Sequence, residues 1–134
     1  MLPARLDKVL KAAADPTRLR LLNLLRLGSI CVCDLQKVLG IPQPTVSRHL
    51  AALRHAGLVG DVRKGMRIVY SLVPGITTQI EALHQLLDRC CPEDAVMRAD
   101  IVRFRGAVAA GTCRLETADS EDSAPGAQLE GNLA

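Results

Sequence analysis

The sequence predicts a mainly α-helical protein of the winged helix-turn-helix class, with helices and a two-stranded β-hairpin wing. Three observations support this class. Two short helical patterns joined by a tight turn occupy residues 31–57, an alternating hairpin pattern occupies 58–72, and the apolar residues are almost all aliphatic. Hydrophobic residues make up 49% of the 134 residues, yet the chain has one Tyr, one Phe and no Trp. This composition favours a core of helices packed on helices.

Length and charge predict one domain with a polyanionic partner. A chain of 134 residues can bury a single substantial core. The net charge of +3 is unevenly distributed, because residues 112–134 hold one Arg and five acidic side chains, a net charge of −4, and the remainder carries +7. A basic body with an acidic tail suits a nucleic acid, although many other soluble proteins share this balance.

The cysteines and the apolar pattern predict a cytoplasmic protein. The sequence shows neither a signal-peptide pattern nor an apolar run of about 18 residues, so we expect no secretion and no membrane span. Five cysteines, an odd number, are better explained as thiols than as a disulfide framework.

The N-terminal segment predicts two helices. The first is amphipathic, with apolar positions at Leu2, Leu6, Val9, Leu10 and Ala13. The second begins after Asp15, a favourable N-cap residue, with Pro16 at its first position, and ends near Gly28. Because leucines lie on more than one face of this second helix, we expect it to be central in the core.

A third helix, capped by Ser29, is expected to carry Cys31 and Cys33 in or beside its first turn. Helix N-termini favour anions, so we expect these thiols to ionise more readily than free cysteine. Residues two apart on a regular helix point about 200° from each other. One ion could therefore bind both sulfurs only if the start of the helix unwinds or bends, which would couple ion binding to the neighbouring helix.

The third and fourth helices form a predicted helix-turn-helix. The inward positions are Leu35, Val38 and Leu39 on the third helix and Val46, Leu50 and Leu53 on the fourth. Gly40 ends the former and Pro44 suits the first turn of the latter. Thr45 and Arg48 then point outward, with Ser47 and His49 on the flanks, and such side chains bond base edges and phosphates. A helical hairpin within an all-helical core is the alternative.

A basic hairpin follows. Residues 58–63 and 66–72 alternate as strands around Lys64-Gly65, where glycine allows the turn. We expect Met66, Ile68, Tyr70 and Leu72 to share one face. The tip collects Arg63, Lys64 and Arg67, which would meet phosphate or the minor groove. A solvated hairpin whose charges only confer solubility is the alternative.

The last long helix predicts a homodimer. Its apolar positions are Ile76, Ile80, Leu83, Leu87 and Cys90. This narrow stripe is typical of a coiled-coil seam, and we expect it to pair with the first helix and with a second subunit. Ordinary core packing is the alternative.

The pattern divides the chain into three segments. Residues 1–92 form a DNA-binding and dimerisation domain that ends at Cys90-Cys91-Pro92. Residues 93–111 form a C-terminal helical extension, with Asp94 as its cap and Val96, Ile101, Phe104 and Val108 as its apolar positions. Residues 112–134 form an acidic tail that we expect to be disordered.

Several segments together resemble the ArsR/SmtB metalloregulatory repressors. They are ADPTRLRLL (14–22), CVCDL (31–35), PQPTVSRHL (42–50), LRHAGLV (53–59) and RKGMRIVYSL (63–72), and the likeness covers residues 5–90 or so. It implies a winged-helix homodimer that leaves its operator DNA when a thiophilic ion binds. The implied DNA contacts are Gln43, Thr45, Ser47, Arg48, His49, Arg63, Lys64 and Arg67.

CVCDL resembles the inducer box of the arsenic-responsive branch, which implies Cys31 and Cys33 as ligands of trivalent arsenic. Some arsenic-responsive members carry a third cysteine where this chain has Gln36, a poor ligand for a soft ion. The third thiolate could be Cys90, Cys91 or Cys113, or a non-protein ligand could complete the site. Cys90 and Cys91 could also form a site of their own, and two thiols would be enough for methylarsenite.

Other signals remain open. The box also resembles that of cadmium and lead sensors, although the cysteines that such sensors recruit from an N-terminal extension are missing before Cys31. Zinc sensing would use Glu81, His84 and Asp88, a spacing more typical of a solvated stripe. A disulfide between Cys90 and Cys91, or between one of them and a box cysteine, could sense oxidation, and zinc held by the cysteines could be purely structural.

We expect no enzyme and no catalytic cofactor. A small thiol reductase would need a C-x-x-C motif or a cysteine opening a phosphate-binding loop, and the sequence has neither. The leading hypothesis is a repressor released by arsenite or methylarsenite.

Overall fold

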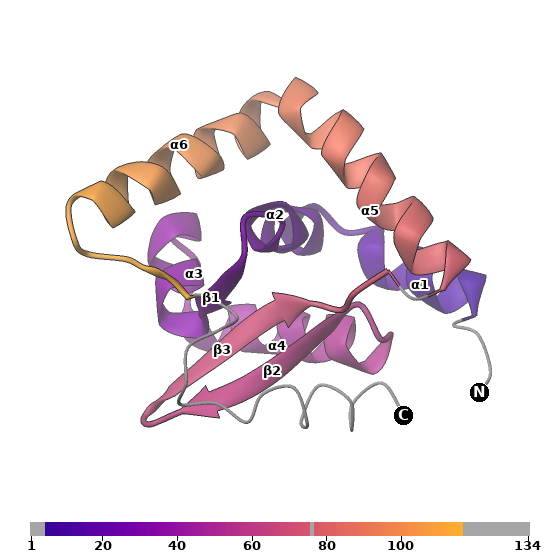
Figure 1. The fold of residues 1–134 in the computed structure, drawn as a ribbon, viewed down its shortest axis with the longest axis horizontal. Coiled ribbons are helices and arrows are strands. Elements are labelled where there is room, and N and C mark those ends of the chain that lie inside the picture. Colours follow the sequence, from indigo (N-terminus) through magenta and orange to yellow (C-terminus); the bar gives the residue numbers. More distant parts are fainter. Residues whose placement is uncertain (1–4, 76, 117–134) are drawn as a thin grey trace.

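The computed structural model describes residues 5–75 and 77–116 and has the predicted winged helix-turn-helix architecture (Figure 1). The elements are α1 (Leu6–Ala13), α2 (Pro16–Leu25), β1 (Ser29–Cys31), α3 (Val32–Leu39), α4 (Gln43–His55), β2 (Val59–Lys64), β3 (Arg67–Leu72), α5 (Thr78–Cys90), the 3₁₀ helix η1 (Cys91–Glu93), α6 (Ala95–Ala109) and β4 (Leu115–Glu116).

The helix boundaries follow the local capping signals. The Asp15 carboxylate accepts hydrogen bonds from the backbone N–H groups of Thr17 (2.9 Å) and Arg18 (3.1 Å), and Pro16 is the first residue of α2. The bond from Arg18 is the main reason that the pKa of Asp15 lies below its ordinary value. Gly40 ends α3 in the left-handed conformation, with φ of 67°. These boundaries are as predicted.

The hairpin belongs to a larger antiparallel sheet of order β2-β3-β1-β4. The last pair of the hairpin is Lys64 with Arg67, so the turn is Gly65-Met66 rather than Lys64-Gly65. Gly65 adopts φ of 63°, as a tight hairpin turn requires. The prediction that Met66 shares one strand face with Ile68, Tyr70 and Leu72 was wrong, because Met66 lies in the turn, where it is 94% exposed.

The strand β1 was not predicted. Ser29 pairs within the sheet and bonds Ser71 through its hydroxyl (2.6 Å), so it does not cap α3 as expected. β1 lies between β3 and β4, with Cys31 opposite Val69 and Ser29 opposite Glu116. A strand of three residues is too short to show an alternating pattern, so the sequence around Ser29 resembles a helix cap more than a strand.

The core surrounds α2. Its buried leucines are Leu21, Leu22, Leu24 and Leu25, and α4 contributes Val46, Leu50 and Leu53. Ile80, Leu83 and Leu87 of α5 are buried in the core of this chain, which is the alternative of ordinary core packing rather than a seam open to a second subunit, and Cys90 is exposed and leaves the stripe. Ile76 and Leu2 lie outside the described residues.

α5 and α6 form the two arms of a V over α2 (Figure 1). α6 begins at its predicted cap, since Asp94 accepts from the Met97 N–H, and it packs on α2 and α3 and places Phe104 in the shared core. Val96 and Val108 of the same helix are exposed. Residues 112–116 are ordered and include β4, so the expectation of disorder was wrong for them, and residues 117–134 lie outside the described part. No helix within 5–75 and 77–116 is long and apolar enough to span a lipid bilayer.

Candidate nucleic-acid interface and thiol site

α4 presents the side chains predicted to read DNA. Val46, Leu50 and Leu53 are fully buried, which fixes the opposite face of the helix toward solvent. Gln43 and Arg48 are exposed, and Thr45, Ser47 and His49 are half-buried at the edges of that face. The helix therefore offers a short polar surface with a cationic side chain at its centre.

His49 is held by a residue that the sequence analysis missed. Arg18 of α2 donates from its Nε to the His49 Nδ1 (3.1 Å), and its Nη1 reaches the Ala12 carbonyl (3.5 Å). Arg18 thereby ties α4 to the α1–α2 corner. The two residues are 31 positions apart and no local pattern connects them, so spacing alone could not have found this pair.

The basic tip of the hairpin is partly neutralised by the last strand. Glu116 of β4 forms ion pairs with Arg67, with Lys64 (3.8 Å) and with Arg114 (3.2 Å). Burial alone would raise the pKa of Glu116, but the hydrogen bond from Arg67 and the three cations outweigh it and lower that pKa. Arg63 remains exposed. The predicted wing cations are together, and an unforeseen carboxylate lies among them.

The Cys31 and Cys33 sulfurs are in contact, 2.6 Å apart, within the described structure. We expected them to point away from each other on one helix, and this was wrong. Cys31 ends β1 with extended dihedrals (φ −66°, ψ 143°), and only Cys33 lies in the first turn of α3. The bend between strand and helix brings both sulfurs to one side, so one ion can reach both without unwinding α3.

The expected ionisation of the thiols was also wrong for Cys33. Burial, the hydrogen bond with Cys31 and the nearby charges of Cys31 and Asp34 raise the pKa of Cys33 to about 11. Burial likewise raises the pKa of Cys113 and of Cys91. At Cys33 the positive end of α3 would lower the pKa of the thiol, but its burial raises that pKa by more.

The structure separates the three further candidate ligands. Cys113 is buried and lines a pocket together with Cys33 and Asp34. Cys90 and Cys91 instead line an apolar pocket at the end of α5 with Met97. Within residues 5–75 and 77–116, no three His, Cys, Asp or Glu side chains are already placed to hold one metal ion.

The zinc alternative on α5 finds little support in the geometry. Glu81 and Asp88 are exposed and His84 is half-buried. Asp88 accepts a hydrogen bond from Arg26 of α2 (3.1 Å). These side chains are placed as a solvated helix surface would be.

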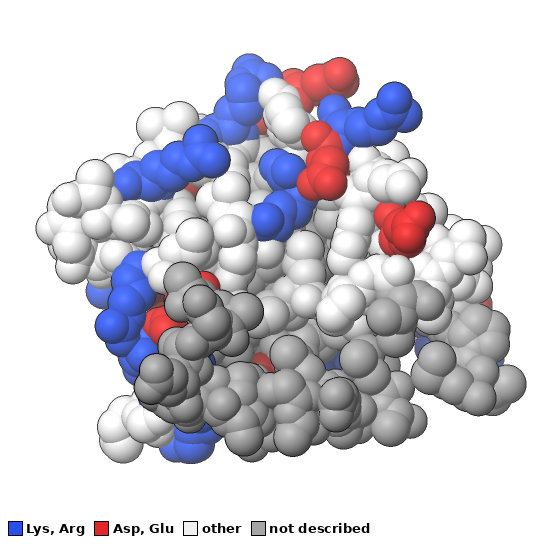
Figure 2. Space-filling model, in the orientation of Figure 1, with Lys and Arg blue, Asp and Glu red and all other residues white. Residues whose placement is uncertain are grey.

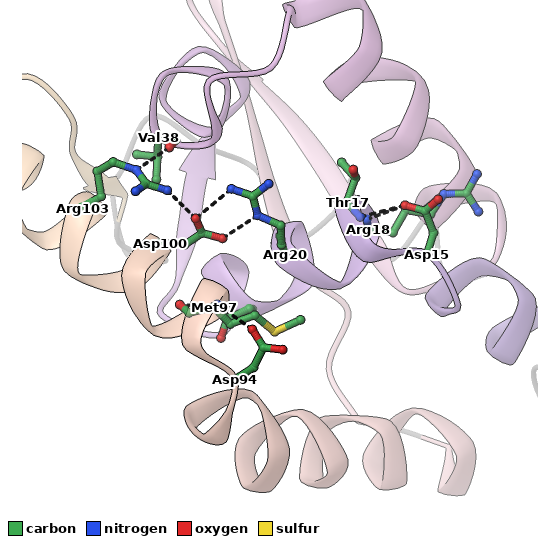
Figure 3. A network of polar contacts seen from close by, with 10 residues as sticks. Asp15, Thr17, Arg18, Arg20, Val38, Asp94, Met97, Asp100 and Arg103 are labelled. Carbon is green, nitrogen blue, oxygen red and sulfur yellow. Dashed lines mark hydrogen bonds and ion pairs between the residues drawn. The ribbon is translucent and has the colours of Figure 1, made fainter.

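A buried ionic network fastens the thiol-bearing helix to the rest of the core (Figure 3). Asp100 of α6 is fully buried and accepts two bonds from Arg20 of α2 (2.8 and 2.9 Å). Arg103 bonds the same carboxylate and donates from its Nε to the Val38 carbonyl at the end of α3 (2.8 Å). The network joins three helices across 80 positions of sequence, and periodicity gave no sign of it.

The face formed by α5 and α6 carries charges of both signs, unlike α4. Figure 2 shows Lys and Arg side chains interspersed with Asp and Glu on this side of the molecule. Mixed charge of this kind is typical of an ordinary solvated surface rather than of one that attracts a polyanion. α4 and the tip of the hairpin therefore remain the better candidates for contact with DNA.

Comparison with known sequences agrees with this arrangement. Residues 15–60 match the family described as "Bacterial regulatory protein, arsR family". The arsenic resistance transcriptional regulator ArsR1 of Pseudomonas putida is 45% identical over 76 residues, which are 56% of this chain and 59% of that protein. The arsenical resistance operon repressor of Escherichia coli is 48% identical over 77 residues, 57% of this chain and 63% of the repressor. The match thus spans less than two thirds of these two relatives.

A further relative is covered more fully. The arsenic resistance transcriptional regulator ArsR2 of Pseudomonas putida is 39% identical over 79 residues, which are 58% of this chain and 69% of that protein.

Two solved structures share the fold. Reduced HlyU from Vibrio cholerae superposes with a TM-score of 0.55 and 34% identity, over 62% of this chain and 84% of HlyU. The homodimeric winged helix-turn-helix DNA-binding domain of Mb0332 from Mycobacterium bovis, a possible ArsR-family regulator, gives a TM-score of 0.55 and 31% identity, over 65% of this chain and 78% of that domain.

Proposed function

The chain belongs to the arsR family of bacterial regulatory proteins, and from this we propose that it is a transcriptional repressor which trivalent arsenic releases from its operator DNA. The observation that carries the proposal is the contact between the Cys31 and Cys33 sulfurs beside the helix-turn-helix. The relatives named above are transcriptional regulators, which favours this role over catalysis.

DNA recognition is assigned to α4 and the hairpin. Gln43, Thr45, Ser47, Arg48 and His49 would meet base edges and phosphates from α4. Arg63, Lys64 and Arg67 would meet the DNA backbone or the minor groove from the hairpin. The homodimeric state of the Mb0332 domain supports a homodimer here, which would place two α4 helices on two half-sites of an operator.

Release is assigned to the thiol pair. Trivalent arsenic is soft and binds thiolates, and two sulfurs on one side of the chain can share one arsenic atom. Cys31 belongs to the strand paired with β3, and Cys33 belongs to α3, which packs on α4. An arsenic atom bound to both would therefore act on the hairpin and on the reading helix together. The arsenic resistance regulators among the relatives support this choice of inducer.

The test is fluorescence anisotropy of the reduced protein on DNA from its own promoter, with arsenite titrated in. We expect tight binding without arsenite and release near one arsenic per subunit. Cys33→Ser should bind DNA like the wild type and fail to release it, whereas Cys90→Ser, the same change at an exposed cysteine away from the pair, should respond normally. Release of Cys33→Ser at the wild-type arsenite concentration would remove the pair from the proposal. Release by cadmium, lead or zinc but not arsenite would keep the repressor and change its inducer.

Thiol oxidation is the second candidate signal, favoured by the same contact. Two free sulfurs in contact can be joined by an oxidant, and the matching HlyU structure is described as reduced. Peroxide should then abolish DNA binding in the absence of arsenic, and dithiothreitol should restore it. Binding that peroxide leaves intact would exclude this signal.

A further inference from the structure

We propose that Cys113 supplies a third thiolate to the arsenic bound by Cys31 and Cys33, carried to it by residues 111–116, which we name the C-terminal strap. This inference rests on the proposed function, because it completes the same site. It concerns a residue 80 positions beyond the pair, so the fold and not the local motif brings them together.

The strap forms one wall of the thiol pocket. This pocket has a volume of about 260 Å³ and is lined by Cys33, Asp34 and Arg67 on one side and by residues 111–114 on the other. Cys113 is almost completely buried there, so its thiol faces the protein interior rather than solvent. A small neutral molecule such as As(OH)₃ would lie between Cys33 and Cys113 in this pocket.

Asp34 holds the strap against the CVCDL segment, residues 31–35. Its carboxylate accepts the backbone N–H of Arg114 (3.0 Å), and it lines the same pocket as Cys113. The other oxygen of Asp34 lies 3.8 Å from the Cys33 sulfur. One buried carboxylate therefore adjoins both Cys33 and Cys113, and it keeps the third sulfur close without an ion present.

Two further contacts position the strap. Lys37 of α3 donates to the Thr112 carbonyl (3.0 Å), and β4 pairs with β1 beside the thiol pair. Gly111 begins the strap with φ of 82°, and the backbone N–H groups of Thr112 and Cys113 both donate to the Ala107 carbonyl (2.9 and 3.2 Å). These bonds fasten the start of the strap to the end of α6.

A small rearrangement completes the site. The described residues include no ready-made set of three metal ligands, so the Cys113 thiol must turn toward the pair. With arsenite, As(OH)₃, three As–O bonds break and three As–S bonds form. Each thiol proton leaves with a hydroxide as water, and arsenic stays trivalent throughout, so no oxidant or reductant is needed.

Cys113 is favoured over the other cysteines by position. Cys91 is buried at the junction of α5 and η1, in the apolar pocket that also contains Cys90. That pocket shares no lining residue with the thiol pocket. Recruiting Cys91 would require α5 or α3 to leave the core, whereas Cys113 already lines the correct pocket.

The test is X-ray absorption at the arsenic edge on the reduced full-length protein loaded with one equivalent of arsenite. We expect three sulfur neighbours in the wild type, two sulfurs and one oxygen in Cys113→Ser, and three sulfurs in the matched control Cys91→Ser. Arsenite affinity should fall at least tenfold in Cys113→Ser. Phenylarsine oxide, which needs two thiols, should bind the wild type and Cys113→Ser equally well.

The outcomes separate this inference from the proposed function. Two sulfurs in the wild type, or three in Cys113→Ser, would overturn the role of Cys113 and leave the pair intact. Failure of the wild type to bind phenylarsine oxide would overturn the pair itself and the strap with it. The number of sulfur neighbours around arsenic in the wild type is decisive by itself. The inference can therefore be rejected even if Cys113→Ser folds poorly.

Discussion

At the scale of single residues, Cys31 stands where two kinds of structure meet. Its backbone pairs with Val69 in the sheet, it is the N-cap residue of α3, and its sulfur contacts Cys33. An ion bound there, as proposed, would be bonded to a strand and to a helix at once. It would therefore act on both parts of the proposed DNA-binding surface, with no need for α3 to unwind.

Arg48 provides the test of the reading face. Arg48→Ala should weaken operator binding roughly tenfold to a hundredfold, because an exposed arginine at the centre of that face would make a bidentate base contact or bond a phosphate. Fluorescence anisotropy on promoter DNA measures the affinity.

Arg105→Ala is the matched control for Arg48, because it removes the same charge from an exposed site on α6. It should bind DNA like the wild type. Arsenite binding by Arg48→Ala should be unchanged, and equal DNA affinity of the two variants would remove Arg48 from the interface.

At the scale of elements, α6 acts as a brace for α3. Its buried Asp100 joins Arg20 to Arg103, and Arg103 in turn bonds the last turn of α3 (Figure 3). Removing one partner from such a network leaves a buried charge unpaired, so the network holds α3 firmly only while all members are present. The helix-turn-helix therefore depends on a helix that begins 40 positions after it ends.

Arg103→Ala should lower the free energy of unfolding by about 1.5 kcal/mol, because it removes hydrogen bonds to a charged group and to a carbonyl. Arg105→Ala, two positions further on the exposed side of the same helix, should change it by less than about 0.5 kcal/mol. Urea unfolding followed by circular dichroism measures both. Similar midpoints for the two variants would show that the brace adds no stability.

β4 has only two residues, but it changes the charge at the tip of the hairpin. Through Glu116 it places a negative charge among the cations of the hairpin. Glu116→Gln should strengthen DNA binding several-fold and should steepen the dependence of log K on log salt concentration by up to about one. Anisotropy titrations at several salt concentrations measure both quantities.

The control for Glu116 is Glu93→Gln in the 3₁₀ helix, which makes the same charge change at an exposed site away from the hairpin. We expect it to leave affinity and salt dependence as they are in the wild type. If Glu116→Gln and Glu93→Gln behave alike, the hairpin cations are not near phosphate.

At the scale of the whole molecule, exposed leucines lie on two helices that contact each other. Leu6 and Leu10 of α1 and Leu86 of α5 are each more than half exposed, and α1 contacts α5. Large exposed apolar side chains on adjoining helices are typical of a subunit interface. We infer that the proposed dimer uses this α1–α5 surface.

Leu86→Glu should therefore raise the dimer dissociation constant about a hundredfold, because a two-fold interface loses two buried leucines and gains two charges. Sedimentation velocity over a concentration series measures this constant. Val102→Glu on α6, where the native side chain is 71% exposed, is the control and should leave it unchanged. A dimer of normal stability in Leu86→Glu would place the interface elsewhere.

Sequence patterns correctly predicted the features that depend on residues close together in the chain. The caps at Asp15 and Asp94, the end of α3 at Gly40 and the buried face of α4 all follow from residues within one or two turns. The hairpin was predicted for the same reason, with an error of one residue at its turn.

The remaining features depend on contacts distant in sequence. β1 and β4 are too short to show a period, and the Arg20–Asp100 and Arg67–Glu116 pairs join residues that are far apart in the chain. The thiol pair shows the same limit, because the positions of Cys31 and Cys33 were predicted from helical geometry while a strand paired with β3 governs Cys31. Where the chain leaves a regular element, spacing no longer gives side-chain direction.

Gly28 lies against the C-terminal strap, and this contact limits which residues can replace it. Its φ of 146° disfavours every other residue, and a Cβ there would lie 3.0 Å from the Leu115 side chain, directly under β4. A mutation at this position would press against the strap that carries Cys113, although it touches no cysteine. Among related chains, glycine at this place and a cysteine-bearing C-terminal strap should therefore be inherited together and lost together.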